Sequence, residues 1–219
     1  MLGRSIRRLL LMQIFCEVES THQRTLLRLR SADGTNRLTR DCVAALISIV
    51  GELKQKPKPL IITGNRKIFS AGADLAEIAR LSAPEALEFS RAGQFLMNEI
   101  EQFPAPVCAA IEGYGMGGGL DLALACHRRI ASPHAIFGHR GAALGLITGW
   151  GGTQRLARLI GKSPTLAMLV AAEKLHAVDA LRIGLVDALA DDPVAEALER
   201  LSRNSLPTKG GRKETGAFG

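Results

Sequence analysis

Residues 105–126 read Ala-Pro-Val-Cys-Ala-Ala-Ile-Glu-Gly-Tyr-Gly-Met-Gly-Gly-Gly-Leu-Asp-Leu-Ala-Leu-Ala-Cys, and this pattern organises the whole chain. The apolar run 107–111 predicts a buried strand. Glycine fills five of the seven positions 113–119, and Leu and Ala then dominate residues 120–126, which favours a helix. A helix N-terminus exposes backbone N–H groups that lack intrahelical acceptors, and such groups bind negative charge. The segment therefore predicts a strand, an anion-binding glycine turn and a helix.

Asp121 is the polar side chain of this predicted helix and lies in its first turn. It is the one carboxylate between Glu112 and Glu173. If the glycine turn needs a local acid or base, Asp121 is the candidate. The opposing interpretation is that Asp121 only interacts with the dipole of its own helix. The local sequence does not decide between these two roles.

The spacing Gly113-x-Gly115-x-x-Gly118 matches the dinucleotide-binding fingerprint, which also follows a strand and precedes a helix. That fingerprint needs an acidic residue about 20 positions later to bind the ribose. Residues 122–172 contain neither Asp nor Glu. A nicotinamide-dependent oxidoreductase is therefore a distant third hypothesis.

A second turn of small residues follows a second predicted strand, at residues 59–63. Residues 64–74 read Gly-Asn-Arg-Lys-Ile-Phe-Ser-Ala-Gly-Ala-Asp and lead to a predicted helix near Leu75. Backbone N–H groups in such a turn are also candidates for an anion site. The opposing interpretation is an ordinary loop between a strand and a helix.

Strands and helices alternate along the rest of the chain, which predicts an α/β protein. Ser82-Ala-Pro-Glu85 is a capping box that begins a helix to about residue 102. Ser163-Pro164 predicts the start of another helix. Further strands are expected at 25–29, 128–137 (as two short strands) and 185–189, and further helices at 38–53, 153–160, 177–183 and 194–201.

The composition favours one globular domain in a reducing compartment. Of 219 residues, 47% are hydrophobic, which is enough to bury a core. The four cysteines show no metal-ligand spacing and are expected to be reduced, so we expect a cytoplasmic protein without a metal site. The net charge of +7 is concentrated at the two ends, without a basic stripe interleaved with aromatic residues. We therefore expect neither a nucleic-acid partner nor a membrane span.

Four blocks of sequence resemble the crotonase family, that is, the enoyl-CoA hydratase/isomerase superfamily. Their joint order is specific, and with weaker similarity from Thr25 the resemblance covers about residues 25–190. The blocks are 60–64 (Leu-Ile-Ile-Thr-Gly) with 68–74 (Ile-Phe-Ser-Ala-Gly-Ala-Asp), 106–126, 137–156 (ending Gly-Trp-Gly-Gly-Thr-Gln-Arg-Leu) and 180–186 (Ala-Leu-Arg-Ile-Gly-Leu-Val).

The resemblance implies a spiral of ββα units that assembles as a homotrimer or hexamer. It implies an acyl-CoA thioester as substrate, with no cofactor beyond that coenzyme A. It also implies that the backbone N–H groups of Ala73 and Gly118 bind the thioester oxygen and stabilise an enolate. Asp121 takes the position of the first of two glutamates that hydratases of the family use. The resemblance places further substrate-binding residues at Ala71, Gly72, Asp74, Gly117, Arg140, Gly141 and Trp150.

Two features depart from the family pattern. The second glutamate position is Gly141, which has no side chain, so the chain lacks the second carboxylate that hydration by such a pair uses. Arg140 could bind a substrate carboxylate or face solvent, His139 could shuttle a proton or be a structural loop residue, and Trp150 could line the acyl pocket or only pack. The family also continues with helices beyond Leu189, whereas this chain has a shortened C-terminal helical region.

The first hypothesis is accordingly an acyl-CoA enzyme that hydrates, isomerises or decarboxylates its substrate through an enolate. The second is a non-catalytic acyl-CoA-binding or subunit-interaction protein that has kept the fold. We expect a basic N-terminal extension and first strand region at 1–24, the acyl-CoA domain at 25–203 and a disordered tail at 204–219. Residues 1–12 could also be a targeting segment.

Overall fold

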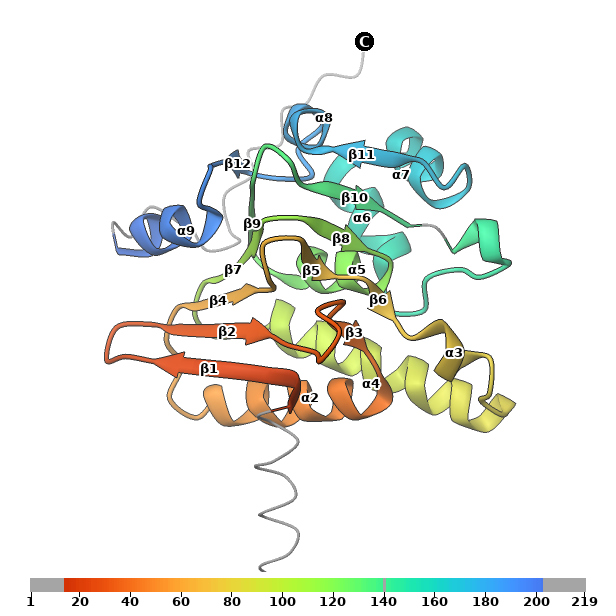
Figure 1. The fold of residues 1–219 in the computed structure, drawn as a ribbon, viewed down its shortest axis with the longest axis horizontal. Helices are drawn as coiled ribbons and strands as arrows, with labels where there is room; N and C mark the ends of the chain where they lie inside the picture. The colour runs from red at the N-terminus through yellow and green to blue at the C-terminus, as the bar shows by residue number, and fades with distance from the viewer. Residues whose placement is uncertain (1–13, 140, 203–219) are drawn as a thin grey trace, which may run out of the picture.

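The computed structural model describes residues 14–139 and 141–202, in which a six-stranded, a four-stranded and a two-stranded sheet are surrounded by helices (Figure 1). Outside the described residues lie positions 1–13 of the N-terminal region predicted at 1–24, the whole tail predicted at 204–219, and Arg140. The strands are β1 (Cys16–Ser20), β2 (Thr25–Leu29), β3 (Arg37–Leu38), β4 (Leu60–Thr63), β5 (Ile68–Ser70), β6 (Gly72–Ala73), β7 (Val107–Ile111), β8 (Tyr114–Met116), β9 (Arg128–Ala131), β10 (Ile136–Gly138), β11 (Lys174–His176) and β12 (Ala188–Leu189). The helices are α2 (Arg40–Leu53), α3 (Leu75–Ile78), α4 (Ala83–Glu101), α5 (Gly118–Ala125), the 3₁₀ turn η1 (Ala142–Leu144), α6 (Gly152–Ile160), α7 (Lys162–Leu169), α8 (Ala177–Arg182) and α9 (Pro193–Ser202).

The larger sheet has the strand order β1-β2-β4-β7-β9-β12 and is parallel from β2 onward. Its central strands β4 and β7 are buried along their whole length. Buried strands of a parallel sheet are apolar on both faces, which explains the uninterrupted apolar runs at these positions. Helices α2 and α4 pack together on one side, and the N-terminal half of the sheet lies above them in Figure 1. Helix α9 covers the other face of β4, β7 and β9.

The smaller sheet has the order β11-β10-β8-β5, and its strands β5, β8 and β10 are parallel. Each central turn of the chain thus adds one strand to the larger sheet, one strand to the smaller sheet and then a helix. The unit β7-β8-α5 shows this arrangement most clearly (Figure 1). This repeat confirms the predicted α/β spiral of ββα units.

Helix starts follow the capping signals in two cases. The Thr39 hydroxyl accepts a hydrogen bond from the Cys42 amide at 3.1 Å, where α2 begins. The Ser82 amide donates to the Glu85 carboxylate at 2.9 Å, and this capping box opens α4 as predicted. The cap predicted at Ser163 is wrong, because α7 already begins at Lys162 and its N-cap is Gly161.

In the smaller sheet, β10 is the second of the two short strands predicted at 128–137, whereas β5, β8 and β11 were not expected from the sequence. The segment predicted as a plain glycine turn contains β8, which is paired on both sides by β5 and β10. Strands of three residues are too short to show an alternating pattern, so their pairing partners define them. The first strand region expected within 1–24 contains β1, which forms the antiparallel edge of the larger sheet.

A buried ion pair ties β9 to the segment before β12. The guanidinium of Arg129 is 4% exposed and donates to the Asp187 carboxylate at 3.2 Å and to the Leu185 carbonyl at 2.7 Å. Burial lowers the pKa of Arg129, and the charge of Asp187 opposes that shift.

No helix in the described part of the chain is long and apolar enough to cross a membrane.

Candidate active site

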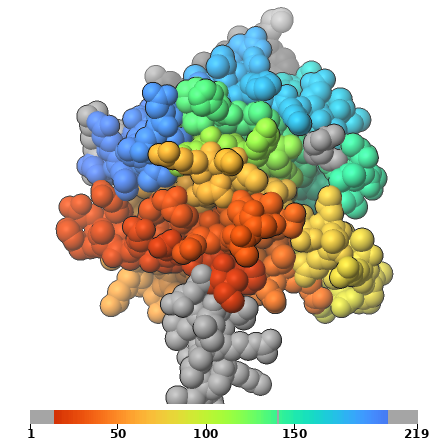
Figure 2. Space-filling model, in the orientation of Figure 1, coloured from red at the N-terminus to blue at the C-terminus, as the bar shows by residue number. Residues whose placement is uncertain are grey.

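One cavity of about 780 Å³ lies at the ends of β6, β8 and β10 and at the start of α5. It is bounded by the segment from α3 to the start of α4 and by the loop 141–149, which lie on the same side of the molecule in Figure 2. The cavity brings together the two glycine-rich turns that the sequence singles out. Its lining residues are Arg37, Ala71, Ala73, Asp74, Leu75, Ala76, Ile78, Leu81, Ala86, Phe89, Ser90, Met116, Gly117, Gly118, Asp121, His139, Gly141, Ala143, Leu144, Leu146, Ile147, Thr148, Gly149 and Trp150.

Ala73 and Gly118 lie next to each other at this cavity, although 45 positions separate them in the sequence. A Cβ placed on Gly118 would be 3.3 Å from the Ala73 amide nitrogen. A Cβ on Gly72 would be 2.7 Å from the Gly118 amide nitrogen. Gly118 is also the first residue of α5, where amide groups have no intrahelical acceptor. The two turns thus place two backbone amides at one wall of the cavity.

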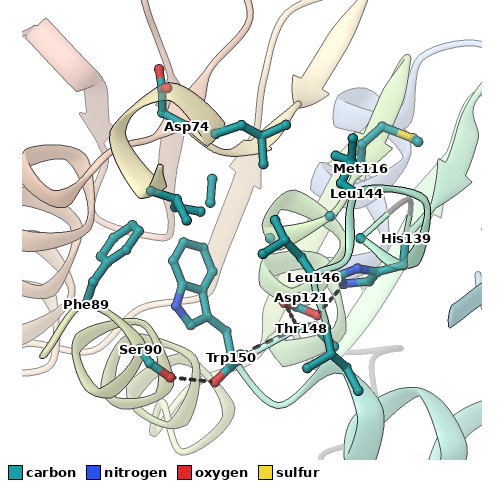
Figure 3. Close-up of a pocket in the computed structure, with 18 of the residues that line it drawn as sticks. Asp74, Phe89, Ser90, Met116, Asp121, His139, Leu144, Leu146, Thr148 and Trp150 are labelled. Atoms are coloured by element: carbon teal, nitrogen blue, oxygen red, sulfur yellow. Dashed lines mark hydrogen bonds and ion pairs between the residues drawn. The ribbon is translucent and has the colours of Figure 1, made fainter. Parts of the chain in front are cut away.

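Asp121 lies one helical turn further along α5, and its side chain is 2% exposed. The His139 Nε2 atom is 3.0 Å from Asp121 Oδ1, and the Thr148 hydroxyl donates to Oδ2 at 2.5 Å (Figure 3). A buried carboxylate needs such partners because its desolvation is otherwise costly. Asp121 therefore belongs to a polar cluster inside the cavity and is not a simple helix-capping charge.

Gly141 begins the loop on the far side of the cavity. Its carbonyl accepts hydrogen bonds from the amides of Leu144 and Leu146, both at 2.8 Å, so the chain turns tightly here. A Cβ on Gly141 would lie 2.7 Å from the Leu146 carbonyl oxygen. Real Cβ atoms do not approach backbone so closely, so the present loop conformation requires glycine.

Trp150 fills the space between α4 and the start of α5. Its indole ring packs edge-on against Phe89, with ring centroids 5.2 Å apart and an interplanar angle of 88°. Only 5% of Trp150 is exposed. The carbonyl of Gly149, next to Trp150 in the chain, accepts a hydrogen bond from the side-chain amide of Gln94 at 2.7 Å, and this bond connects the loop to α4. Trp150 both packs and lines the cavity, so the two roles considered from the sequence are not exclusive.

Comparison with known sequences matches residues 25–205 to the family described as enoyl-CoA hydratase/isomerase. The chain belongs to this family. A curated relative named crotonyl-CoA hydratase, from Syntrophomonas wolfei subsp. wolfei, is 39% identical over 173 residues. The alignment covers 78% of this chain and 66% of the relative, so the chain spans just under two thirds of that relative's length.

Solved structures share the fold of this chain. DspI of Pseudomonas aeruginosa is 33% identical, with a TM-score of 0.83 over 89% of this chain and 81% of that one. An enoyl-CoA hydratase from Bacillus anthracis is 31% identical, with a TM-score of 0.82 over 87% of this chain and 76% of that one. These likenesses confirm the resemblance to the crotonase family.

Most residues that the family resemblance predicted for the site do line the cavity: Ala71, Ala73, Asp74, Gly117, Gly118, Asp121, Gly141 and Trp150. Gly72 does not line it and instead packs behind it, against the Met116 carbonyl and the Gly118 amide. Asp74 lies at the rim with its carboxylate directed away from Asp121 (Figure 3). Its Oδ1 accepts hydrogen bonds from the amides of Ala76 and Glu77, which caps α3.

The sequence did not single out Thr148, and it left His139 as a structural loop residue or a proton shuttle. Both contact the carboxylate of Asp121 from the other side of the cavity. Neither residue type is unusual in a glycine-rich loop, so no local signal marks them. Among residues 14–139 and 141–202, no group of His, Cys, Asp and Glu side chains is placed to hold a metal ion.

Proposed function

We propose that this chain is an acyl-CoA enzyme that forms an enolate in the cavity. The observation that carries the proposal is the shared location of two adjacent backbone amides, those of Ala73 and Gly118, and one buried carboxylate, Asp121. The family membership supplies the substrate class, a coenzyme A thioester. Backbone donors and a base within one cavity are the groups that enolate chemistry requires.

The two amides would bind the thioester carbonyl oxygen. When a proton leaves the α-carbon, the electron pair of the C–H bond moves into the carbonyl and the oxygen becomes an enolate. Hydrogen bonds from Ala73 and Gly118 then strengthen as the charge on this oxygen grows. One donor of this kind lowers a barrier by about 3 kcal/mol. The start of α5 adds a favourable dipole at the same place.

Asp121 would transfer the proton. Its carboxylate takes the proton from C2 of a 3-enoyl thioester, and the C–H electron pair forms the conjugated enolate. The protonated Asp121 then returns the proton to C4, which leaves the 2-enoyl thioester and the original carboxylate. Such an isomerisation needs one acid–base group, and this fits a cavity in which Gly141 supplies no second carboxylate.

The apolar wall would hold the acyl chain. Leu75, Ile78, Leu81, Phe89 and Trp150 line the cavity on the side of α3 and α4. This wall contains no described carboxylate except Asp74, which caps α3. An apolar pocket with few polar groups at one end is typical of sites for fatty acyl groups.

Hydration is the second candidate, because the 39% identical relative from Syntrophomonas wolfei is named a crotonyl-CoA hydratase. Water addition needs a base for the water and a proton donor for the α-carbon, and in this cavity Asp121 and His139 are the groups close enough to share that work. Decarboxylation remains a third reaction of the same enolate. A non-catalytic acyl-CoA-binding protein is the competing proposal, motivated by Gly141.

A turnover screen of the purified protein by mass spectrometry separates these candidates. The panel holds crotonyl-CoA, 3-hexenoyl-CoA, methylmalonyl-CoA and ethylmalonyl-CoA, each also run with the Asp121→Asn variant. We expect 3-hexenoyl-CoA to keep its mass and shift its retention time, in a reaction that the variant loses. A gain of water by crotonyl-CoA would establish hydration instead, and a loss of carbon dioxide would establish decarboxylation. Binding of all four thioesters without turnover would favour the non-catalytic protein.

A further inference from the structure

His139 contacts the carboxylate on which the proposed reaction depends. Its ring is almost fully buried, its Nε2 atom is 3.0 Å from Asp121 Oδ1, and it lines the cavity. In Figure 3 the imidazole and the Thr148 hydroxyl approach Asp121 from the loop side, opposite Trp150. Each carboxylate oxygen of Asp121 therefore has one hydrogen-bond partner, and each keeps a further lone pair that can accept a substrate proton.

The backbone fixes His139 relative to Asp121. His139 directly follows β10, which pairs in parallel with β8. The Gly117 amide donates to the Gly138 carbonyl at 2.9 Å, so the residue before His139 is bonded to the residue that caps α5. Asp121 is in the first turn of that helix, and its own amide donates to the Gly117 carbonyl at 3.1 Å. Short, rigid connections thus hold both side chains.

We propose that His139 is a positioning residue for Asp121. Its Nε2–H donates to Oδ1, Thr148 donates to Oδ2, and together they prevent the carboxylate from rotating about its Cβ–Cγ bond. The free lone pairs of Asp121 then keep one direction in the cavity that Ala73 and Gly118 also line. Neither His139 nor Thr148 transfers a proton to or from the substrate, so both residues act only by positioning Asp121.

The proposal rests on the proposed function, since it assigns His139 a role in the same proton transfer. Its physical basis is that a reacting group misplaced by about 1 Å can lose on the order of a hundredfold in rate. Binding of the thioester does not depend on the rotation of Asp121. Loss of His139 should therefore lower the rate constant and leave the affinity unchanged.

The test measures exchange of the α-hydrogens of butyryl-CoA and octanoyl-CoA for deuterium in D₂O, at saturating thioester, together with the dissociation constant of each thioester. The variants are His139→Gln, which keeps an N–H donor, and His139→Leu, which does not. Thr148→Val, which removes the hydroxyl donor, and Thr148→Ser, which keeps it, test the hydrogen bond to Oδ2 of Asp121 independently. His134 is an exposed histidine five positions earlier, so His134→Leu is the matched control. Thermal unfolding of each variant verifies that it is folded.

We expect His139→Leu and Thr148→Val to lose about tenfold or more in exchange rate at unchanged affinity, whereas His139→Gln and Thr148→Ser stay within about threefold of the wild type.

Wild-type exchange in the folded His139→Leu variant would overturn the proposal. If His139→Gln were folded yet as slow as His139→Leu, His139 would itself carry a proton, and the positioning role would be wrong. If neither thioester exchanged with the wild-type protein although both bound, the proposed function would fail and this inference with it. If the wild type exchanged and only Asp121→Asn lost the rate, the inference alone would fail.

Discussion

The indole ring of Trp150 lies against Gly118 so closely that a Cβ on Gly118 would be 2.4 Å from the Cζ3 atom. The residue proposed to bind the thioester oxygen is thus also the residue on which the largest aromatic side chain of the cavity packs. An indole enclosed by Phe89 and α4 cannot move away easily. This contact connects the shape of the acyl pocket to the position of the Gly118 amide.

We expect Gly118→Ala to displace either the amide or the indole. The predicted result is a loss of enolate formation of about a hundredfold, measured as α-hydrogen exchange, with a destabilisation of about 1–3 kcal/mol from overpacking. The matched control is Gly51→Ala in α2, where an added Cβ meets no atom within 4 Å. Ala is favoured over Gly inside a helix by about 1 kcal/mol, so the control should be at least as stable as the wild type. Wild-type exchange in Gly118→Ala would exclude Gly118 from the oxyanion site.

Asp121→Asn keeps the shape of the side chain and removes its basicity. We expect the rate of the proposed proton transfer to fall by about a hundredfold or more, with little change in thioester affinity measured by calorimetry. Asp74→Asn is the control, because Asp74 lines the same cavity but caps α3, and Asn is an equally good N-cap. Equal losses in the two variants would contradict the assignment of Asp121 as the proton-transfer residue.

The burial of Asp121 predicts partial retention of the substrate's hydrogen. With 2% of the side chain exposed, a deuteron taken from C2 of a labelled 3-enoyl thioester exchanges with water in only part of the turnovers before it is returned to C4. We expect mass spectrometry of the product made in ordinary water to show more than half of the transferred label. A product free of label would mean that water reaches Asp121 in every turnover.

Introducing a glutamate at Gly141 is not expected to create a two-carboxylate hydratase. The Leu146 carbonyl lies 2.7 Å from the position of a Cβ at residue 141, so the loop 141–149 must rearrange to accept any side chain. We predict that Gly141→Glu fails to gain water addition to crotonyl-CoA and destabilises the protein about as much as Gly141→Ala does, by about 1–3 kcal/mol. A hydratase activity gained by Gly141→Glu would show that the loop adapts.

The four cysteine thiols are all buried, and burial raises the pKa of Cys42 and Cys108 to about 12. The pKa values of Cys16 and Cys126 are raised for the same reason. We expect fewer than one thiol per native chain to react with a disulfide reagent at about pH 8, and all four after unfolding, because the thiolate is the reactive form. Rapid labelling of the native protein would show that the core opens.

The same raised pKa values predict a loss of stability in alkali. Folded thiols stay protonated while unfolded thiols ionise above about pH 8.5, so their contribution is fully present below that pH and is lost as the pH rises towards about 12. The free energy of unfolding in urea should therefore fall between about pH 8 and pH 10. The decrease should be smaller in Cys42→Ala, which lacks one of these thiols. An identical decrease in both proteins would assign the effect to other groups.

The sequence by itself predicted the elements whose residues carry a complete local pattern. Residues 107–111 are apolar at every position, and they form β7 with these bounds. The capping box Ser82–Glu85 begins α4, since its two hydrogen bonds are formed within four residues. The joint order of the glycine-rich blocks also identified the family. Each of these features is written in the order of residues along the chain, so no tertiary structure is needed to recognise it.

The tertiary structure alone decided what the candidate site contains. The three-residue strand β8 exists because parallel partners bind it on both sides, and the fold brings His139, which follows β10, and Thr148, which lies in the loop after η1, against Asp121. The sequence could name Asp121 as a base but left open whether it merely interacted with a helix dipole. The need for glycine at position 141 likewise becomes visible only in the folded loop, where the Leu146 carbonyl occupies the space of a side chain. Contacts between distant segments are set by packing geometry, which local composition does not encode.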